Sequence, residues 1–169
     1  MHLRSTLLAL LLAASASFTA ARAATNNNSP NDLRAAIVYN IVRFVDFPGS
    51  GNRLEMCVAR NADGASQMLA LRGQRVGNRS ISVRMVDSAS VGGCDVFYLG
   101  HASAAETARA RSHGVLLVGD TPSFINSGGT VGLVRMGKQI RFEINARNAQ
   151  HAGLTISSKL LRLAARVEQ

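Results

Sequence analysis

Apolar and polar residues recur with two different periods along this chain, and each change of period marks a new element. Between residues 32 and 45 apolar residues return every three or four positions, which predicts an amphipathic helix. Pro30 is suited to open it, and Phe47-Pro48-Gly49 ends it. Ser103 and Glu106 form the S-x-x-E pattern of a capping box and predict another helix start. The predicted helices span residues 32–45, 65–71, 103–112 and 145–152, the last of these capped by Asn145, with a final helix after Ser157.

Short apolar or alternating stretches between these helices predict strands. Residues 94–99 and 115–118 are almost wholly apolar, which is typical of inner strands of a parallel sheet. Residues 81–85 alternate apolar with polar, as a half-buried strand does. Two further stretches flank Met136-Gly137-Lys138 and predict an antiparallel hairpin. The predicted strands span residues 54–58, 81–85, 94–99, 115–118, 130–135 and 139–144.

The order of these elements predicts the fold class. Strands alternate with helices in the first part of the chain, and the hairpin comes late. This order indicates a single α/β domain with a mixed five- or six-stranded sheet flanked by helices. No internal repeat or linker divides it.

The first residues have the pattern of an export signal. An apolar run from Leu7 to Ala14 is followed by small residues and by Ala21-Arg22-Ala23, an A-x-A cleavage pattern. The run is shorter than the about 20 apolar residues that a spanning helix needs. We therefore expect a cleaved signal peptide at 1–23, a flexible leader at 24–30 and one domain at 31–169. An uncleaved N-terminal anchor is the alternative.

The chain is basic, with 19 Lys and Arg against 10 Asp and Glu and a formal net charge of +9. Cleavage after Ala23 would remove two basic and no acidic residues, which leaves +7. Such a charge suits nucleic acid, an anionic membrane face or an acidic partner. The arginines are scattered without interleaved aromatic residues for base stacking, and export separates the protein from the genome. We therefore expect no nucleic-acid binding.

Cys57 and Cys94 are the only cysteines. An even count in an exported chain favours one disulfide. Two separately buried thiols are the alternative. A redox-active pair is disfavoured because the chain has no C-x-x-C spacing that would lower a thiol pKa.

No catalytic or metal-binding pattern stands out. His101, His113 and His151 fall on three different predicted elements without ligand spacing, so we expect no metal site. There is no G-x-S-x-G elbow, although folding could still bring distant residues together as a triad. We expect no cofactor and no enzymatic activity.

Three polar residues in the second strand of the hairpin form the candidate binding site. Arg141, Glu143 and Asn145 alternate with Ile140, Phe142 and Ile144, which places the three polar groups on one face of the strand and the apolar ones inward. The polar face is either an ordinary solvated surface or a surface for a ligand or partner.

Several motifs together resemble the YfiR family of exported bacterial proteins. They are AAIVYNIVRFVDFP (Ala35–Pro48), EMCVAR (Glu55–Arg60), GGCDVFYLG (Gly92–Gly100), VLLVGDTPSFINSGGTVGLV (Val115–Val134) and IRFEINARNAQHAGLTISSKLLRLA (Ile140–Ala164). The resemblance covers nearly the whole mature chain and supports a Cys57–Cys94 bridge. The chain departs from the family in having Phe47 where Trp is often found before the proline, and in lacking the second disulfide of some members.

The resemblance implies a periplasmic regulator that acts by binding. It would bind the periplasmic sensor domain of a membrane-bound diguanylate cyclase, repress it, and so lower cyclic-di-GMP signalling and biofilm formation. An outer-membrane-associated lipoprotein as a second partner and a homodimer are also implied. The alternatives are a periplasmic small-ligand-binding protein, with Arg141 meeting an anionic ligand, and a structural or adhesion-associated module.

Overall fold

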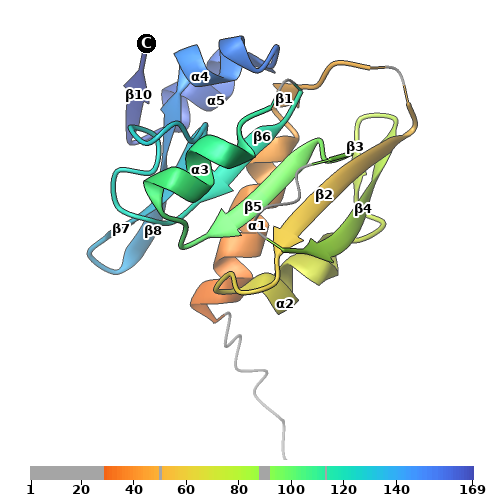
Figure 1. Cartoon of the computed structure of the whole chain (residues 1–169), viewed down its shortest axis with the longest axis horizontal. Helices are drawn as coiled ribbons and strands as arrows, with labels where there is room; N and C mark the ends of the chain where they lie inside the picture. The colour runs from red at the N-terminus through yellow and green to blue at the C-terminus, as the bar shows by residue number, and fades with distance from the viewer. Residues whose placement is uncertain (1–28, 50, 88–91, 113) are drawn as a thin grey trace, which may run out of the picture.

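The computed structural model describes residues 29–49, 51–87, 92–112 and 114–169 (Figure 1). The expected signal peptide at 1–23 lies outside these residues, as does the leader up to residue 28. Ser29 and Pro30, which the sequence assigns to the leader, form the start of helix α1 (Pro30–Val42). The Ser29 hydroxyl accepts a hydrogen bond from the Asp32 amide at 3.2 Å, and the Asp32 carboxylate accepts one from the Ser29 amide at 3.0 Å. This capping box satisfies two backbone donors at the helix start.

Eight strands form the main sheet, in the order β10-β8-β7-β6-β5-β2-β4-β3. Neighbours are parallel from β4 through β2, β5 and β6 to β7, antiparallel at β7–β8 and β3–β4, and parallel at β8–β10. In chain order the five parallel strands read 2-1-3-4-5, which is a doubly wound order. The strands are β2 (Arg53–Ala59), β3 (Arg75–Val76), β4 (Arg79–Val86), β5 (Val96–Gly100), β6 (Leu116–Gly119), β7 (Val131–Met136), β8 (Gln139–Asn145) and β10 (Arg166–Glu168).

The predicted α/β class with a mixed sheet is confirmed, and all six predicted strands are present. The sequence predicts five or six strands where the main sheet has eight, because β3 and β10 lie at its two edges. These strands have two and three residues, which is too short for a visible alternation of apolar and polar residues.

The helices also follow the prediction, with shifted ends. They are α2 (Ala65–Met68) with the 3₁₀ turn η1 (Leu69–Leu71), α3 (Ala104–Ala110), α4 (Ala146–His151) and α5 (Ser158–Leu163). The predicted Ser103–Glu106 capping box and the Asn145 cap are both confirmed. The first helix ends three residues earlier than predicted, because Val45 enters β1 (Val45–Asp46), which pairs with β9 (Thr155–Ile156).

Two strands at the centre of the sheet are buried on both faces. Every residue of β5 and β6 is buried, as their apolar sequences predict. Helix α1 lies behind the sheet and α3 in front of it (Figure 1). The core therefore lies on both sides of the sheet.

A disulfide joins Cys57 in β2 to Cys94, two residues before β5. The predicted bridge is thus confirmed, with the two Cα atoms 5.7 Å apart. The two cysteines are separated by 37 residues in sequence, so the bond restricts a long loop of the unfolded chain.

The ring of Phe124 packs against two glycines where side chains would not fit. A Cβ atom at Gly119, the last residue of β6, would lie 2.4 Å from the ring, and one at Gly129 would lie 2.1 Å from it. Phe124 is 2% exposed, so the segment between β6 and β7 is fixed onto the sheet by this close approach.

Replacing both cysteines by serine (Cys57→Ser with Cys94→Ser) should lower the free energy of unfolding by about 3–4 kcal/mol, because the unfolded chain regains the entropy of the open loop. Urea unfolding of the oxidised wild type, the reduced wild type and the double variant measures this. The reduced wild type is the matched control and should have the same urea midpoint as the double variant. An unchanged midpoint in both would contradict a stabilising role for the bond.

Replacing Gly129 by alanine should cost about 1–3 kcal/mol, because the new methyl group must displace the Phe124 ring. Gly51→Ala is the control, since its Cβ would meet nothing closer than 3.9 Å. In a Phe124→Ala background the same glycine substitution should cost clearly less, which a double-mutant cycle in urea detects. Equal costs in both backgrounds would show that the ring is not the obstacle.

Candidate binding site

The three polar residues predicted from the sequence lie in β8, but only two of them face outward. Arg141 is exposed and Glu143 is half-buried. Asn145 is buried. Its side-chain oxygen accepts a hydrogen bond from the Asn148 amide at 2.8 Å, and its side-chain nitrogen donates one to the Ile125 carbonyl at 3.2 Å. Asn145 therefore caps α4 and anchors a loop, while Arg141 and Glu143 are within reach of a ligand or partner.

Glu143 is bound by Arg166 from the neighbouring strand β10. The guanidinium donates from Nε at 3.2 Å and from Nη2 at 2.9 Å to the two carboxylate oxygens. A second ion pair links Arg166 Nη1 to Glu168 at 3.0 Å. The hydrogen bonds to Glu143 raise the pKa of Arg166, so this residue is a permanent cation beside the β8 surface. The bidentate contact also holds β10 in register on β8.

A cavity of about 500 Å³ opens beside this pair. Its walls combine apolar residues of β7 and β8 with charged residues from six segments of the chain. These charged residues are Arg34, His101, Asp120, Arg135, Glu143 and Arg166.

Asp120 is the most buried charged residue of this cavity, with 4% of its side chain exposed. It follows β6 directly, and His101 follows β5. The carboxyl ends of adjacent parallel strands lie at the same edge of a sheet, which brings the two side chains together. His101 Nδ1 lies 2.8 Å from one Asp120 oxygen, and Arg34 Nε of α1 lies 3.3 Å from the other.

These two contacts are ion pairs rather than well-directed hydrogen bonds. Neither Asp120 oxygen has a hydrogen-bond partner of good geometry among the described residues, although Arg34 and His101 both lie within 4 Å. The Arg34 guanidinium at 3.3 Å supplies positive charge beside this buried carboxylate. Asp120 is thus held by charge rather than by directed bonds.

Tyr98 in β5 lies close to this carboxylate. Burial raises the pKa of Tyr98, and the negative charge of Asp120 raises it further. The phenol is therefore neutral, and it donates a hydrogen bond to the Asp63 carbonyl at 2.9 Å. This bond fixes the loop after β2 against the end of β5.

The position at which doubly wound sheets usually bind ligands is filled in this chain. Such ligands lie outside the carboxyl ends of the strands, where the strand order reverses. Here the reversal falls between β2 and β5, but a Cβ atom at Gly100 would lie 2.7 Å from the Ala62 side chain. The open space is instead found toward β7 and β8, where Asp120 and Glu143 lie.

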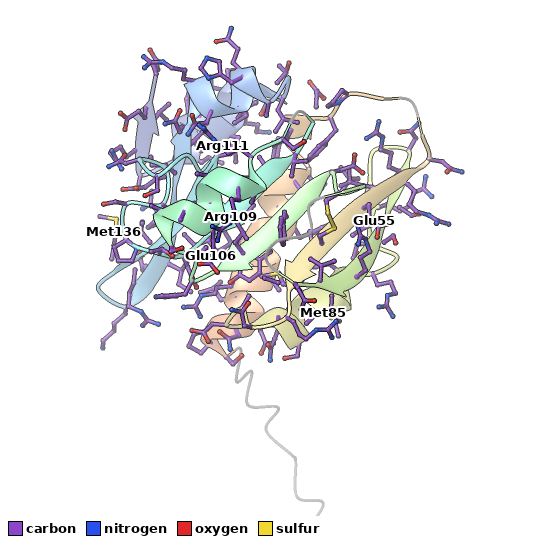
Figure 2. The ribbon with its side chains drawn as sticks, viewed as in Figure 1. Glu55, Met85, Glu106, Arg109, Arg111 and Met136 are labelled. Atoms are coloured by element: carbon purple, nitrogen blue, oxygen red, sulfur yellow. A yellow bond between two sulfur atoms is a disulfide. The ribbon has the colours of Figure 1, made fainter. Side chains whose placement is uncertain are left out.

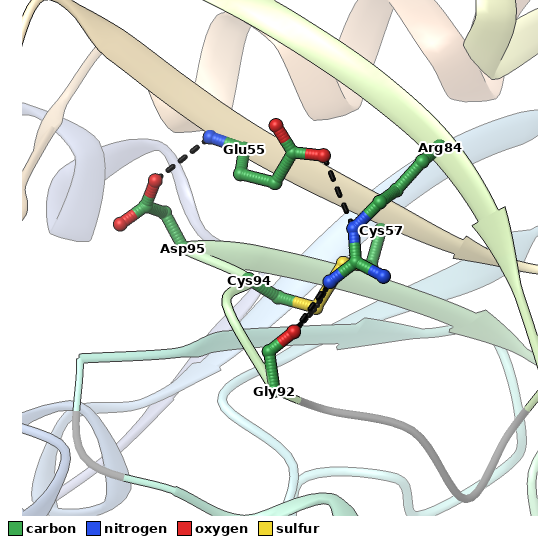
Figure 3. The surroundings of a disulfide bond; sticks show 6 residues. All are labelled: Glu55, Cys57, Arg84, Gly92, Cys94 and Asp95. Atoms are coloured by element: carbon green, nitrogen blue, oxygen red, sulfur yellow. Dashed lines mark hydrogen bonds and ion pairs between the residues drawn. A yellow bond between two sulfur atoms is a disulfide. The ribbon is translucent and has the colours of Figure 1, made fainter.

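Charged residues also surround the disulfide (Figure 3). Arg84 Nε lies 3.1 Å from Glu55, and its Nη2 donates to the Gly92 carbonyl and lies 3.5 Å from Cys94 Sγ. Asp95 accepts from the Glu55 amide at 2.7 Å. Cys57 is fully buried and Cys94 is 7% exposed, so a reductant in the solvent meets Cys94 first.

Sequence reasoning missed Arg34, Asp120 and Arg166. Asp120 could have been found, since it is the first polar residue after an apolar strand, as His101 is after the preceding one. Arg34 and Arg166 carry no such indication, because their partners are distant in sequence.

No group of three His, Cys, Asp or Glu within the described ranges could hold a metal ion. In the same part of the chain, none of the helices has the length and apolar character needed to cross a bilayer.

Solved structures of similar fold include a conserved domain protein from Vibrio cholerae O1 biovar El Tor strain N16961. It is 14% identical with a TM-score of 0.51, over 83% of this chain and 60% of that one. An ABC domain in complex with L-Trp from Streptococcus pneumoniae is 10% identical with a TM-score of 0.49, over 82% of this chain and 60% of that one. The chain thus spans 60% of the length of each. At these identities the Vibrio structure supports the fold alone.

No curated protein sequence matches the chain. A family model described as YfiR/HmsC-like matches residues 31–165. This range includes both cysteines, all of β8, and Asp120 with its neighbours Arg34 and His101. The chain therefore belongs to the YfiR/HmsC-like family, as its sequence motifs indicate.

Proposed function

We propose that this protein is a periplasmic repressor that binds the periplasmic sensor domain of a membrane-bound diguanylate cyclase, and thereby lowers cyclic-di-GMP synthesis and biofilm formation. The observation that supports this most is the YfiR/HmsC-like match over residues 31–165. The resemblance described above implies that members of this family act as periplasmic regulators, by binding. A cleaved signal peptide at 1–23 would deliver the protein to that compartment.

Repression would work by a shift of population. A sensor domain that exchanges between active and inactive conformations is inhibited only as far as the repressor binds the inactive one more tightly. Moving the equilibrium from mostly active to mostly inactive needs an affinity difference of about 10⁴-fold. Strong repression therefore demands a surface that fits one conformation and not the other.

The β8 surface at Arg141 and Glu143 is our proposed contact for a partner or ligand. Arg141 is exposed, and Glu143 is held in one orientation by Arg166. Asn145 contributes indirectly, since it fixes the end of β8 to the start of α4. A rigid strand presents such side chains more accurately than a loop does.

Further partners follow from the family and extend the proposal. An outer-membrane-associated lipoprotein would sequester the repressor and release the cyclase. A homodimer would present two copies of the binding surface.

A second candidate function is the binding of a small anionic ligand in the 500 Å³ cavity. The volume lies in the range of about 300–1,000 Å³ that is usual for ligand pockets. Three guanidinium groups, those of Arg34, Arg135 and Arg166, line it against two carboxylates. Such a ligand would tune the affinity for the cyclase if it bound one form of the repressor better.

Adding the mature protein to membranes that contain the host's diguanylate cyclase should reduce cyclic-di-GMP formation in a saturable way. The cyclase should co-purify with the protein, and reductant should weaken both effects if the Cys57–Cys94 bond maintains the binding surface. Arg141→Glu should weaken repression, whereas Arg60→Ala, which removes an exposed arginine on the opposite half of the sheet, should not. Unchanged synthesis together with no recovered cyclase would reject the proposed function.

Inorganic phosphate or citrate should raise the melting temperature if the cavity binds anions. A ligand at 100 times its Kd stabilises the folded state by about 2.7 kcal/mol, which is a shift of several degrees. Arg135→Ala with Arg166→Ala should abolish the shift, and glucose, a neutral solute, is the control. The same shift in wild type and variant would place anion binding elsewhere.

A further inference from the structure

An apolar groove lies between α1, α5 and β8, on the face of the sheet opposite α3 (Figure 1). We call it the α1–α5 groove. It encloses about 200 Å³, and its apolar lining includes Ile37, Phe44, Ile140, Phe142, Leu160 and Leu163. The Ser157 amide donates to the Phe44 carbonyl at 3.0 Å, which fixes α5 beside the end of α1.

Large apolar side chains at the ends of this groove are exposed. Leu163 on α5 is 55% exposed. Leu33, one turn before Ile37 on the same side of α1, is 41% exposed. From Leu33 to its end at Val42, α1 extends over roughly 14 Å at the rise of an α-helix. Ile37 is half-buried and Ile41 is buried, so Leu33 and Leu163 are the apolar side chains that are largely exposed here. Apolar side chains exposed beside an apolar groove indicate an interaction site.

The rim of the groove is cationic. Lys159 Nζ on α5 lies 5.7 Å from the centre of the Phe44 ring. Arg162 is three residues after Lys159 and therefore on the same side of α5. Neither residue forms an ion pair with a carboxylate among the residues that the structure describes. The apolar surface is thus bordered by positive charges that a partner could neutralise.

Size and charge together indicate the occupant. The volume is below the range of about 300–1,000 Å³ for small-molecule pockets, so one or two inserted side chains fit better than a free ligand. An apolar groove with exposed leucines beside it suits the apolar face of a helix, which inserts side chains at i, i+3, i+4 and i+7. A second copy of this chain would bring the same cations against each other. A lipid surface is flat and does not enter a concave groove.

We propose that the α1–α5 groove docks an amphipathic helix of a protein partner whose apolar face is flanked by Asp and Glu residues. The inference rests on the protein-binding part of the proposed function, but it specifies the partner's chemistry and not its identity. Acidic residues of the helix pair with Lys159 and Arg162, while its apolar residues contact Phe44, Phe142 and Leu163.

Two designed peptides test this without the natural partner. Each has about 18 residues, long enough for measurable helicity, and both share one leucine stripe. One peptide has Glu and the other Lys on the remaining positions. Fluorescence anisotropy with the mature protein should show saturable binding of the Glu peptide only, weakening as salt is added.

Variants of the groove should change this binding in a defined way. Leu163→Glu should raise the Kd for the Glu peptide at least about tenfold, by loss of apolar contact and by repulsion. Lys159→Glu with Arg162→Glu should reverse the preference, so that the Lys peptide now binds more tightly. Leu69→Glu is the control for Leu163→Glu, because it makes the same substitution at another exposed leucine, in η1. Arg109→Glu with Arg111→Glu, at the end of α3, is the control for the double charge reversal (Figure 2). All variants should melt as the wild type does, since the altered side chains are exposed.

Several results would overturn the inference. Equal binding of both peptides, or full binding to Leu163→Glu, would place the contact elsewhere. Capture by phosphatidylglycerol vesicles without peptide binding would make the groove a membrane contact. A dimer that Leu163→Glu dissociates, again without peptide binding, would make it an interface between copies. Peptide binding by a protein that fails to repress the cyclase would reject the proposed function and leave the groove assignment intact.

Discussion

The burial of β5 and β6 on both faces is the constraint on which the rest of this structure depends. Every residue of these two strands is buried, so helices must cover both sides of the sheet. Parallel neighbours then require crossover connections, and these gather the carboxyl ends of the strands at one edge. The polar residues that follow the two strands, His101 and Asp120, meet there as a consequence. An apolar pattern in the centre thus determines where charge is concentrated.

Helix α1 connects that charged edge with the apolar groove. A carboxylate as buried as that of Asp120 is costly unless cations offset it, and α1 supplies Arg34 for this purpose. Successive residues on a helix point about 100° apart, so fixing Arg34 toward the sheet edge also fixes the direction of Leu33 and Ile37. The buried face of α1 at Ala35, Val38, Ile41 and Val42 sets the rotation of the helix, and in that rotation Arg34 reaches the sheet edge while Leu33 stays exposed.

Local patterns were sufficient for the central strands, the helix caps and the disulfide, and insufficient for the edges and the charged cluster. Residues 94–99 and 115–118 show their burial directly in their composition. The sequence of Arg166–Glu168 has no pattern that predicts a strand, because β10 forms only through its pairing with β8 and the Arg166–Glu143 contact. Arg34 and Asp120 are likewise brought together by the tertiary fold alone. Asn145 alternates with its neighbours as a solvated residue would, yet capping of α4 buries it.

The two edges of the sheet restrict how this protein associates with others. A partner that adds a strand needs a long row of unpaired backbone amides and carbonyls. Here one edge is a two-residue strand and the other a three-residue strand rich in charge. Short charged edges of this kind protect a sheet against unwanted strand pairing and aggregation. Beyond β3 and β10, the outer sides of β4 after Ser80 and of β8 before Glu143 have no strand partner among the described residues. Recognition through side chains on the faces of the molecule has the further advantage that a change of sequence alters specificity without disturbing the hydrogen-bonded sheet.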